Sequence, residues 1–184
     1  MVHRKTTKEL LAESFRELAS SKPVDAITVQ GITAHCGYSP ATFYRYFSSK
    51  FDVMAWDYAA NCRAIMDQSG RNRPWPEIIA FGLQYLDEQR AYLRNLLEHT
   101  SGHESFFGYM PSVNTQMLAD GISRRSDGMA LPEGLQVFID IYAAVVTELI
   151  CEWLLGRRMI PLDQFPDILV QALPQPLIPY LHDA

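Results

Sequence analysis

The chain has 184 residues, an apolar content of 48% and a net charge of −5, which allow one large domain or two small ones around a real core. No run of eighteen uncharged apolar residues occurs, and the N-terminal residues lack the apolar run of a secretory signal, so we expect no membrane span and a cytoplasmic protein. Three widely spaced cysteines argue against a disulfide framework or a zinc finger.

The charges are unevenly distributed along the chain. Residues 1–50 contain seven Lys or Arg against four Asp or Glu, whereas residues 51–184 contain nine against seventeen. A basic head on an acidic body would present its positive end to DNA. The asymmetry is modest, and by itself it does not assign a function.

Two helices are predicted before residue 36. Apolar residues recur at helical spacing from residue 4 to about residue 21, where Lys22 and Pro23 end the pattern. Thr28 then caps a short helix, and Gly31 inside it should cost about 1 kcal/mol relative to alanine.

The stretch from Cys36 to Lys50 predicts a turn and a short third helix with two different sides. Gly37 suits a left-handed helix end, Ser39 an N-cap, and Pro40 the first helical position. Phe43 and Phe47, four residues apart, can pack inward together. The hydroxyls and cations then point elsewhere: Thr42, Tyr44, Arg45, Tyr46 and Lys50. Such a helix is suited to lie on a phosphate backbone with its tip in a groove.

The remaining chain predicts more helices and no strand. A fourth helix, about residues 49–67, leads to a Gly- and Pro-rich breaker at 70–76. Further helices are expected from Glu77, over 92–97, over about 112–125, over 134–155 and over 162–173, with an irregular aromatic stretch at 99–112. Gly156 should end the long helix, where Arg157 and Arg158 suit the negative end of the helix dipole.

Three motifs carry a resemblance to a known family. They are T-V-x-x-I at 28–32, C-G-Y-S at 36–39 and T-F-Y-R-Y-F-x-x-K at 42–50. Together, over about residues 6–58, they resemble the TetR/AcrR family of bacterial transcriptional regulators. The closing pattern, a long aromatic helix ending W-L-L-G-R-R before a shorter helix, is similar to the C-terminal type of dihydroxyacetone-kinase-operon regulators.

The resemblance implies an all-α fold of about nine helices. Residues 1–50 would form a homeodomain-like helix-turn-helix head, helix 49–67 a connector, and residues 51–184 a body that binds an effector and dimerises through a four-helix bundle. The protein would be a regulator released from operator DNA by a small molecule, usually a repressor, with no cofactor.

The resemblance also assigns DNA contacts residue by residue. Pro40, Ala41 and Arg45 would approach base edges, where an arginine that takes a guanine bidentately is worth about 1–3 kcal/mol of discrimination. Ser39 would open the recognition helix. The residues implied at phosphates are Thr28, Thr42, Tyr44, Tyr46 and Lys50.

Two further sets of residues are expected in the body. An effector pocket is predicted from Phe81, Tyr85, His99, His103, Phe106, Phe107, Tyr109, Met117 and Tyr142. A dimer interface is predicted from Phe138, Trp153, Leu154 and Leu169.

Two alternative functions stay open. A helical enzyme or metal protein would use the carboxylate pair Glu148 and Glu152 or the histidine pair His99 and His103. A DNA-binding interaction protein without a small ligand would instead have a solid, filled body. We favour the regulator and expect no enzymatic activity, because no Ser/His/Asp grouping, phosphate-cradling glycine loop or cysteine nucleophile setting is legible.

Overall fold

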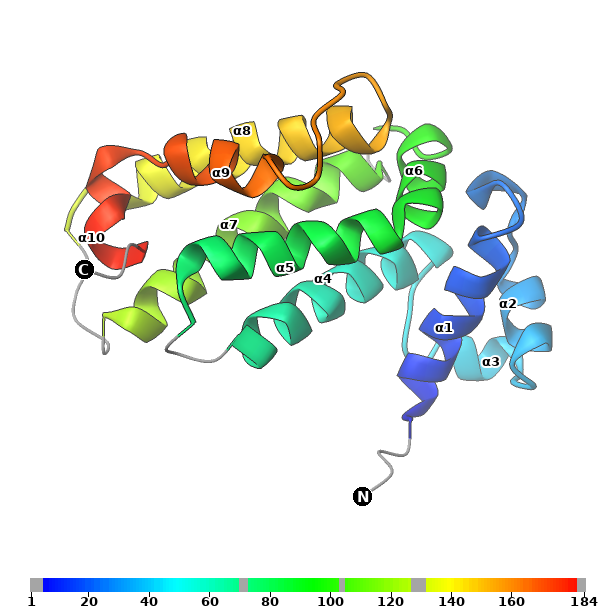
Figure 1. Ribbon diagram of the computed structural model, residues 1–184. Helices are drawn as coiled ribbons and strands as arrows, with labels where there is room; N and C mark the ends of the chain where they lie inside the picture. The colour runs from blue at the N-terminus through cyan, green and yellow to red at the C-terminus, as the bar shows by residue number, and fades with distance from the viewer. Residues whose placement is uncertain (1–4, 70–72, 103–104, 127–131, 182–184) are drawn as a thin grey trace. The chain divides into compact units, whose positions relative to one another are not determined.

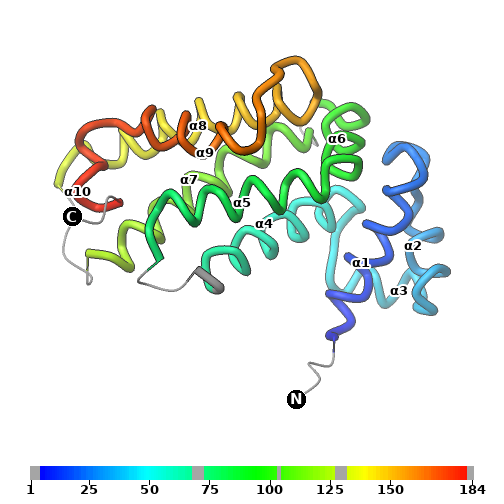
Figure 2. The backbone as a smooth tube through the Cα atoms, in the orientation of Figure 1, coloured from blue at the N-terminus to red at the C-terminus, as the bar shows by residue number. Residues whose placement is uncertain are grey.

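The computed structural model describes residues 5–69, 73–102, 105–126 and 132–181, and these residues form ten α-helices and no strand (Figures 1 and 2). The all-helical prediction is therefore confirmed. Within the same residues, no helix is both long enough and apolar enough to cross a bilayer.

The chain divides into two compact units of packed helices. Unit 1 comprises residues 1–60 and 91–108, and unit 2 comprises residues 61–90 and 109–184. Unit 1 is therefore discontinuous, because a segment of the second half of the chain packs with the N-terminal helices.

Unit 1 begins with three N-terminal helices (Figure 1). They are α1 (Thr7–Ala19), α2 (Val29–His35) and α3 (Pro40–Phe43), with a 3₁₀ turn, η1 (Val24–Ala26), between the first two. Thr6 and Glu9 form a capping box that starts α1. Gly37, at φ 76°, ends α2 as predicted, since the N–H of Tyr38 then reaches the carbonyl of Thr33 at 2.8 Å.

The rest of unit 1 comes from the start of α4 (Lys50–Ser69) and from α6 (Arg90–Glu98). Fully buried apolar side chains from these helices, and from the start of α7 (Phe106–Arg125), form its core, namely Leu11, Phe15, Ile32, Phe43, Met54, Leu96 and Phe106. Because these contacts join residues far apart in sequence, the core under the N-terminal helices includes side chains from later parts of the chain.

Unit 2 is a helical bundle. It contains the end of α4, α5 (Trp75–Glu88), most of α7 (Phe106–Arg125), α8 (Leu135–Leu154), α9 (Phe165–Gln171), the turn η3 (Gln175–Leu177) and α10 (Ile178–Leu181). Helices α8 and α9 lie side by side (Figures 1 and 2), and the Tyr142 hydroxyl donates to the carbonyl of Leu169 at 2.6 Å. Asn114 donates to Thr147 at 2.8 Å and so joins α7 to α8.

Helix α7 differs from its prediction, which started it near residue 112. The helix begins at Phe106 and contains Pro111. Proline lacks an N–H and usually ends a helix, which is why the sequence suggested an irregular stretch. Pro111 lies in the second turn, however, where its missing N–H removes only one helical hydrogen bond.

Candidate nucleic-acid interface

Helix α3 is a short element with a buried aromatic side. Its α-helical part is one turn, and the chain continues to Phe47 through turns in which the N–H groups of Tyr46 and Phe47 both donate to the carbonyl of Phe43. Phe43 and Phe47 are buried with ring centroids 5.7 Å apart, as the sequence predicted. These two rings fix α3 to unit 1, so the intervening side chains must face outward.

The outward side of α3 carries the residues expected to contact DNA. Tyr44 is 61% exposed and Tyr46 is 43% exposed, and Arg45 is exposed between them. Within the described part of the chain, the Arg45 guanidinium forms no hydrogen bond or ion pair. Exposed tyrosine hydroxyls beside an arginine on one surface are groups that can contact a phosphate backbone.

Two hydroxyl groups, those of Thr28 and Ser39, cap helices here, and with the Thr42 hydroxyl they retain O–H donors that could reach a phosphate. The Thr28 oxygen accepts from the N–H of Gly31 at 3.0 Å and starts α2. The Ser39 oxygen accepts from the N–H of Thr42 at 3.2 Å and starts α3, and the two side-chain hydroxyls are 3.0 Å apart. Because the Ser39–Thr42 pair shares one hydrogen bond, one of its two protons remains available to an acceptor outside.

Lys50 has a different role in the structure from the phosphate contact that was expected. Its ammonium donates to the carbonyls of Val24 at 2.7 Å, Asp25 at 3.0 Å and Ile27 at 2.8 Å. An ammonium has three N–H donors, so these carbonyls occupy all of them. The structure therefore assigns Lys50 to holding the turn η1, and we do not place it among the phosphate contacts.

A buried carboxylate on α4 forms hydrogen bonds with side chains of α1 and α6. Asp57 on α4 is 3% exposed, and it accepts two hydrogen bonds from the Arg16 guanidinium on α1, one of them from Nε at 3.2 Å. It also accepts from the Tyr92 hydroxyl on α6 at 3.1 Å. We call Arg16, Asp57 and Tyr92 the Asp57 network. The sequence analysis missed it, although Asp57 lies three residues after the buried Met54 on the apolar side of α4.

The residues expected to line an effector pocket belong to both units and differ in burial. Phe106 packs edge-to-face on Tyr58 in the core of unit 1, with ring centroids 5.2 Å apart, and Tyr142 is buried in the core of unit 2. His99, Phe81 and Phe107 are exposed. Tyr85, Tyr109 and Met117 are half-buried, and His103 lies outside the described residues.

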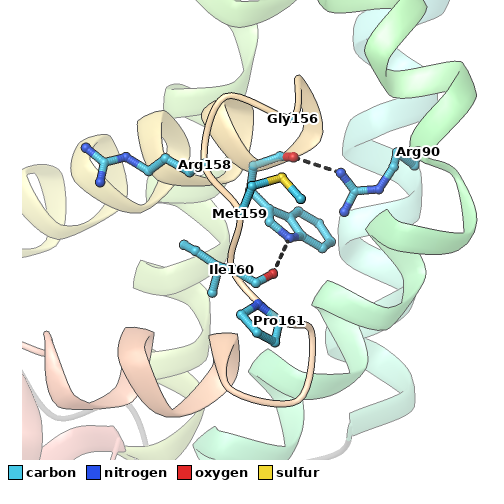
Figure 3. Close-up of a pocket in the computed structure, with 7 residues that line it drawn as sticks. Arg90, Gly156, Arg158, Met159, Ile160 and Pro161 are labelled. Atoms are coloured by element: carbon cyan, nitrogen blue, oxygen red, sulfur yellow. Dashed lines mark hydrogen bonds between the residues drawn. The ribbon is translucent and has the colours of Figure 1, made fainter.

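Unit 2 has a cavity of about 310 Å³ where α8 turns toward α9, and none of the expected pocket residues lines it (Figure 3). It is lined by Arg90, Trp153, Gly156, Arg158, Met159, Ile160 and Pro161. The Arg90 guanidinium stacks 3.8 Å from the Trp153 ring centre and donates to the Trp153 carbonyl at 2.7 Å, while the indole N–H donates to the Ile160 carbonyl. The Arg90 guanidinium and the Trp153 indole N–H therefore already have hydrogen-bond partners within the protein.

The expected interface residues need a correction. Trp153, Leu154 and Leu169 are at most 4% exposed, because they pack inside their own chain and leave almost no surface for a second one. Only Phe138, at 38% exposed, lies on the surface. The exposed apolar residues of α8 are Val137, Phe138, Ile141, Ala144 and Val145, which we call the α8 stripe. Of these, only Phe138 was expected at the interface, because α8 is apolar on two sides and its sequence does not show which side faces out.

Of the residue pairs behind the alternative functions, the structure describes both glutamates, whereas His103 lies outside the described residues. Glu148 is exposed, and Glu152 pairs with Arg157 at 3.1 Å. Burial, helped by the charges of these two glutamates, raises the pKa of the Cys151 thiol between them to about 12. The described residues contain no group of three metal-ligating side chains.

Comparison with known proteins identifies the N-terminal region. Residues 10–55 match the family model of bacterial regulatory proteins, tetR family. A curated relative from Lactococcus lactis subsp. lactis, the HTH-type dhaKLM operon transcriptional activator DhaS, is 23% identical over 101 residues, 55% of this chain and 54% of the relative. The sequence match thus spans about half of that relative's length.

Solved structures extend the likeness to most of the chain. The dihydroxyacetone kinase operon activator DhaS has a TM-score of 0.68 at 17% identity, covering 96% of this chain and 98% of its own. A TetR transcriptional regulator from a Rhodococcus strain gives 0.68 at 16% identity, covering 94% and 97%. A tetR-family regulator from Streptomyces coelicolor gives 0.62 at 19% identity, covering 90% and 78%. Residues 10–55 therefore match the tetR family model, and most of the chain has a fold similar to that of these regulators.

Proposed function

We propose that this protein is a homodimeric regulator that binds operator DNA in the cytoplasm and responds to a small molecule. One observation carries the proposal: inside the matched residues 10–55, Tyr44, Arg45 and Tyr46 stand exposed over the buried Phe43 and Phe47. The aromatic rings anchor the element, so its hydroxyls and its free cation are held outward in fixed positions.

The exposed groups divide into two kinds of DNA contact. The hydroxyls of Thr28, Tyr44, Tyr46 and the Ser39–Thr42 pair would donate to phosphates, which positions the protein without reading sequence. Pro40, Ala41 and Arg45 would meet base edges. The first two offer only apolar contact, for example with thymine methyl groups, so Arg45 is the one side chain of this set able to read a guanine by hydrogen bonds.

A second copy of the chain would cover the α8 stripe. Two heads bind successive major grooves only when they are about 34 Å apart, which requires a defined dimer. The α8 stripe is a continuous apolar surface on one side of a 20-residue helix, which suits the self-complementary contact of a twofold dimer. With α9 it would form the four-helix bundle expected from the sequence.

An effector would act by preferring one separation of the two heads. Such coupling is reciprocal and typically amounts to about 1–3 kcal/mol. We infer that the protein is a repressor that its effector releases. The related DhaS is named as an activator, so a reporter gene placed behind the operator is needed to show whether loss of the protein raises or lowers transcription.

The DNA contacts can be tested with duplexes selected from a random library by the wild-type protein. Replacing Arg45→Ala should relax the preference at particular base pairs. Replacing Tyr44→Phe removes only a hydroxyl and should weaken binding to every duplex by on the order of tenfold, the value of one hydrogen bond to a charged group. Fluorescence anisotropy measures both, with Tyr109→Phe in unit 2 as the matched control. Wild-type binding by both variants would show that α3 is not the DNA-contacting element.

A further inference from the structure

The link between α1 and α2, residues 19–27, is held by a side chain from the second half of the chain. Asn95 on α6 donates from Nδ2 to the carbonyl of Ala19 at 2.5 Å and to the carbonyl of Lys22 at 2.7 Å. Its Oδ1 accepts from the backbone N–H of Val24 at 3.3 Å. One amide therefore closes the C-terminal end of α1 and the start of η1 at the same time.

The polarity of these contacts specifies an amide. Asn95 is half-buried, and both of its N–H donors face carbonyl oxygens while its oxygen faces an N–H. A carboxylate of the same shape would place an oxygen opposite two carbonyl oxygens and would have no donor for either. The last carbonyls of a helix lack partners within the helix, so an outside donor is what this position requires.

The same link is also held from α4. The three carbonyls that accept from Lys50 belong to Val24, Asp25 and Ile27, within and directly after η1. Thr28 follows at once as the N-cap of α2, with its hydroxyl exposed. Asn95 and Lys50 thus fix the backbone that leads into the first proposed phosphate contact, and neither side chain itself lies on the exposed side of α3.

We propose that Asn95 is a positioning residue for DNA binding, so that the DNA-binding unit includes α6 as well as the matched residues 10–55. The proposal rests on the proposed function. Without Asn95 the link loses these partners at the end of α1, so the start of α2, with Thr28, is held less firmly against α1. Specific binding needs α2 and α3 in register with the groove, whereas nonspecific attraction to phosphates tolerates a shift of either helix.

The test compares three variants of the full chain. Asn95→Ala removes the three contacts, and Asn95→Asp keeps the shape but reverses the polarity. Arg94→Ala is the matched control, because Arg94 lies on the same helix and, among the described residues, pairs with the exposed Glu98 alone, at 2.7 Å. Each protein is titrated with the best duplex selected by the wild type and with a scrambled duplex. Circular dichroism and thermal unfolding are recorded at the same temperature and salt concentration.

We expect Asn95→Ala to bind the selected duplex on the order of tenfold more weakly, which corresponds to roughly one net hydrogen bond. Asn95→Asp should lose at least as much, and Arg94→Ala should bind as the wild type does. The scrambled duplex should change much less with all three. A loss equal on both duplexes would mean a merely structural role and would overturn the proposal, as would unchanged binding by Asn95→Ala. If the wild type selects no duplex, the proposed function fails first, and this inference falls with it.

Discussion

Replacing Ile141→Asp on α8 should dissociate the protein into folded monomers. Ile141 lies in the middle of the α8 stripe and is 54% exposed, with Val137 at 57% and Val145 at 59% on either side. Because the side chain already faces solvent in one chain, the carboxylate meets no buried group there, and the monomer should keep its helices. Only the complex of two chains loses an apolar contact.

The size of the effect follows from the exposed fraction and from symmetry. Burying a whole isoleucine side chain is worth about 1.5–3 kcal/mol, so covering the exposed half of Ile141 contributes roughly 1 kcal/mol per protomer. A polar group left unpaired in the same place costs a further ~1–3 kcal/mol. Both losses occur twice in a twofold dimer, so the dimer is destabilised by about 4 kcal/mol or more. That total raises the dimer dissociation constant by on the order of a thousandfold.

Sedimentation velocity over a concentration series measures the dissociation constant, and circular dichroism checks the fold. Ile141→Leu keeps the volume and the apolar character, so this control should remain dimeric. Affinity for the selected duplex should fall together with dimerisation, because linking two DNA-binding heads in one dimer raises the effective concentration of the second head. If Ile141→Asp stays as dimeric as Ile141→Leu, the α8 stripe is not the interface.

Three further predictions concern stability and reactivity. Asp57→Ala should lower the free energy of unfolding by about 3 kcal/mol in urea titrations, because it leaves Arg16 without its buried partner. The control Asp52→Ala, at the start of α4, should lower it by about 1 kcal/mol. Equal losses in the two variants would contradict a buried network. Gly37→Ala should cost about 1–2 kcal/mol, since φ is 76° there, and an unchanged melting temperature would refute the strain. Because burial raises its pKa from 9.0 to about 12, the Cys151 thiol should resist alkylation in the folded protein, which mass spectrometry checks. The stability that this thiol contributes below pH 9 should disappear as the pH rises toward 12, which unfolding measured at a series of pH values checks.

The helix-turn-helix region was predictable because its signals are local. The caps Thr28 and Ser39, the left-handed Gly37 and the pair Phe43 and Phe47 each act within four residues along the chain, and the structure has all of them in the expected places. Short-range geometry of this kind depends little on what the rest of the protein does.

The contacts that support this region were not predictable from the sequence. Asn95 meets carbonyls more than seventy residues away, and Lys50 meets a turn more than twenty residues away. Nothing in the periodicity of α6 distinguishes an asparagine that caps another helix from one on a solvated surface. The outward-facing apolar residues of α8 were also not predictable. Trp153 and Leu154 are apolar like the α8 stripe, and only the packed bundle shows which side of α8 is left uncovered.

The discontinuity of unit 1 has a consequence for how the protein is made. During translation the first sixty residues leave the ribosome well before α6, because the segment 61–90 must be synthesised between them. At synthesis rates of about 5–20 residues per second, this delay lasts roughly 2–6 s. For that time the end of α1 and the turn after it lack Asn95, and Asp57 lacks the hydroxyl of Tyr92. The nascent N-terminal helices therefore reach their final packing only when the second half of the chain arrives.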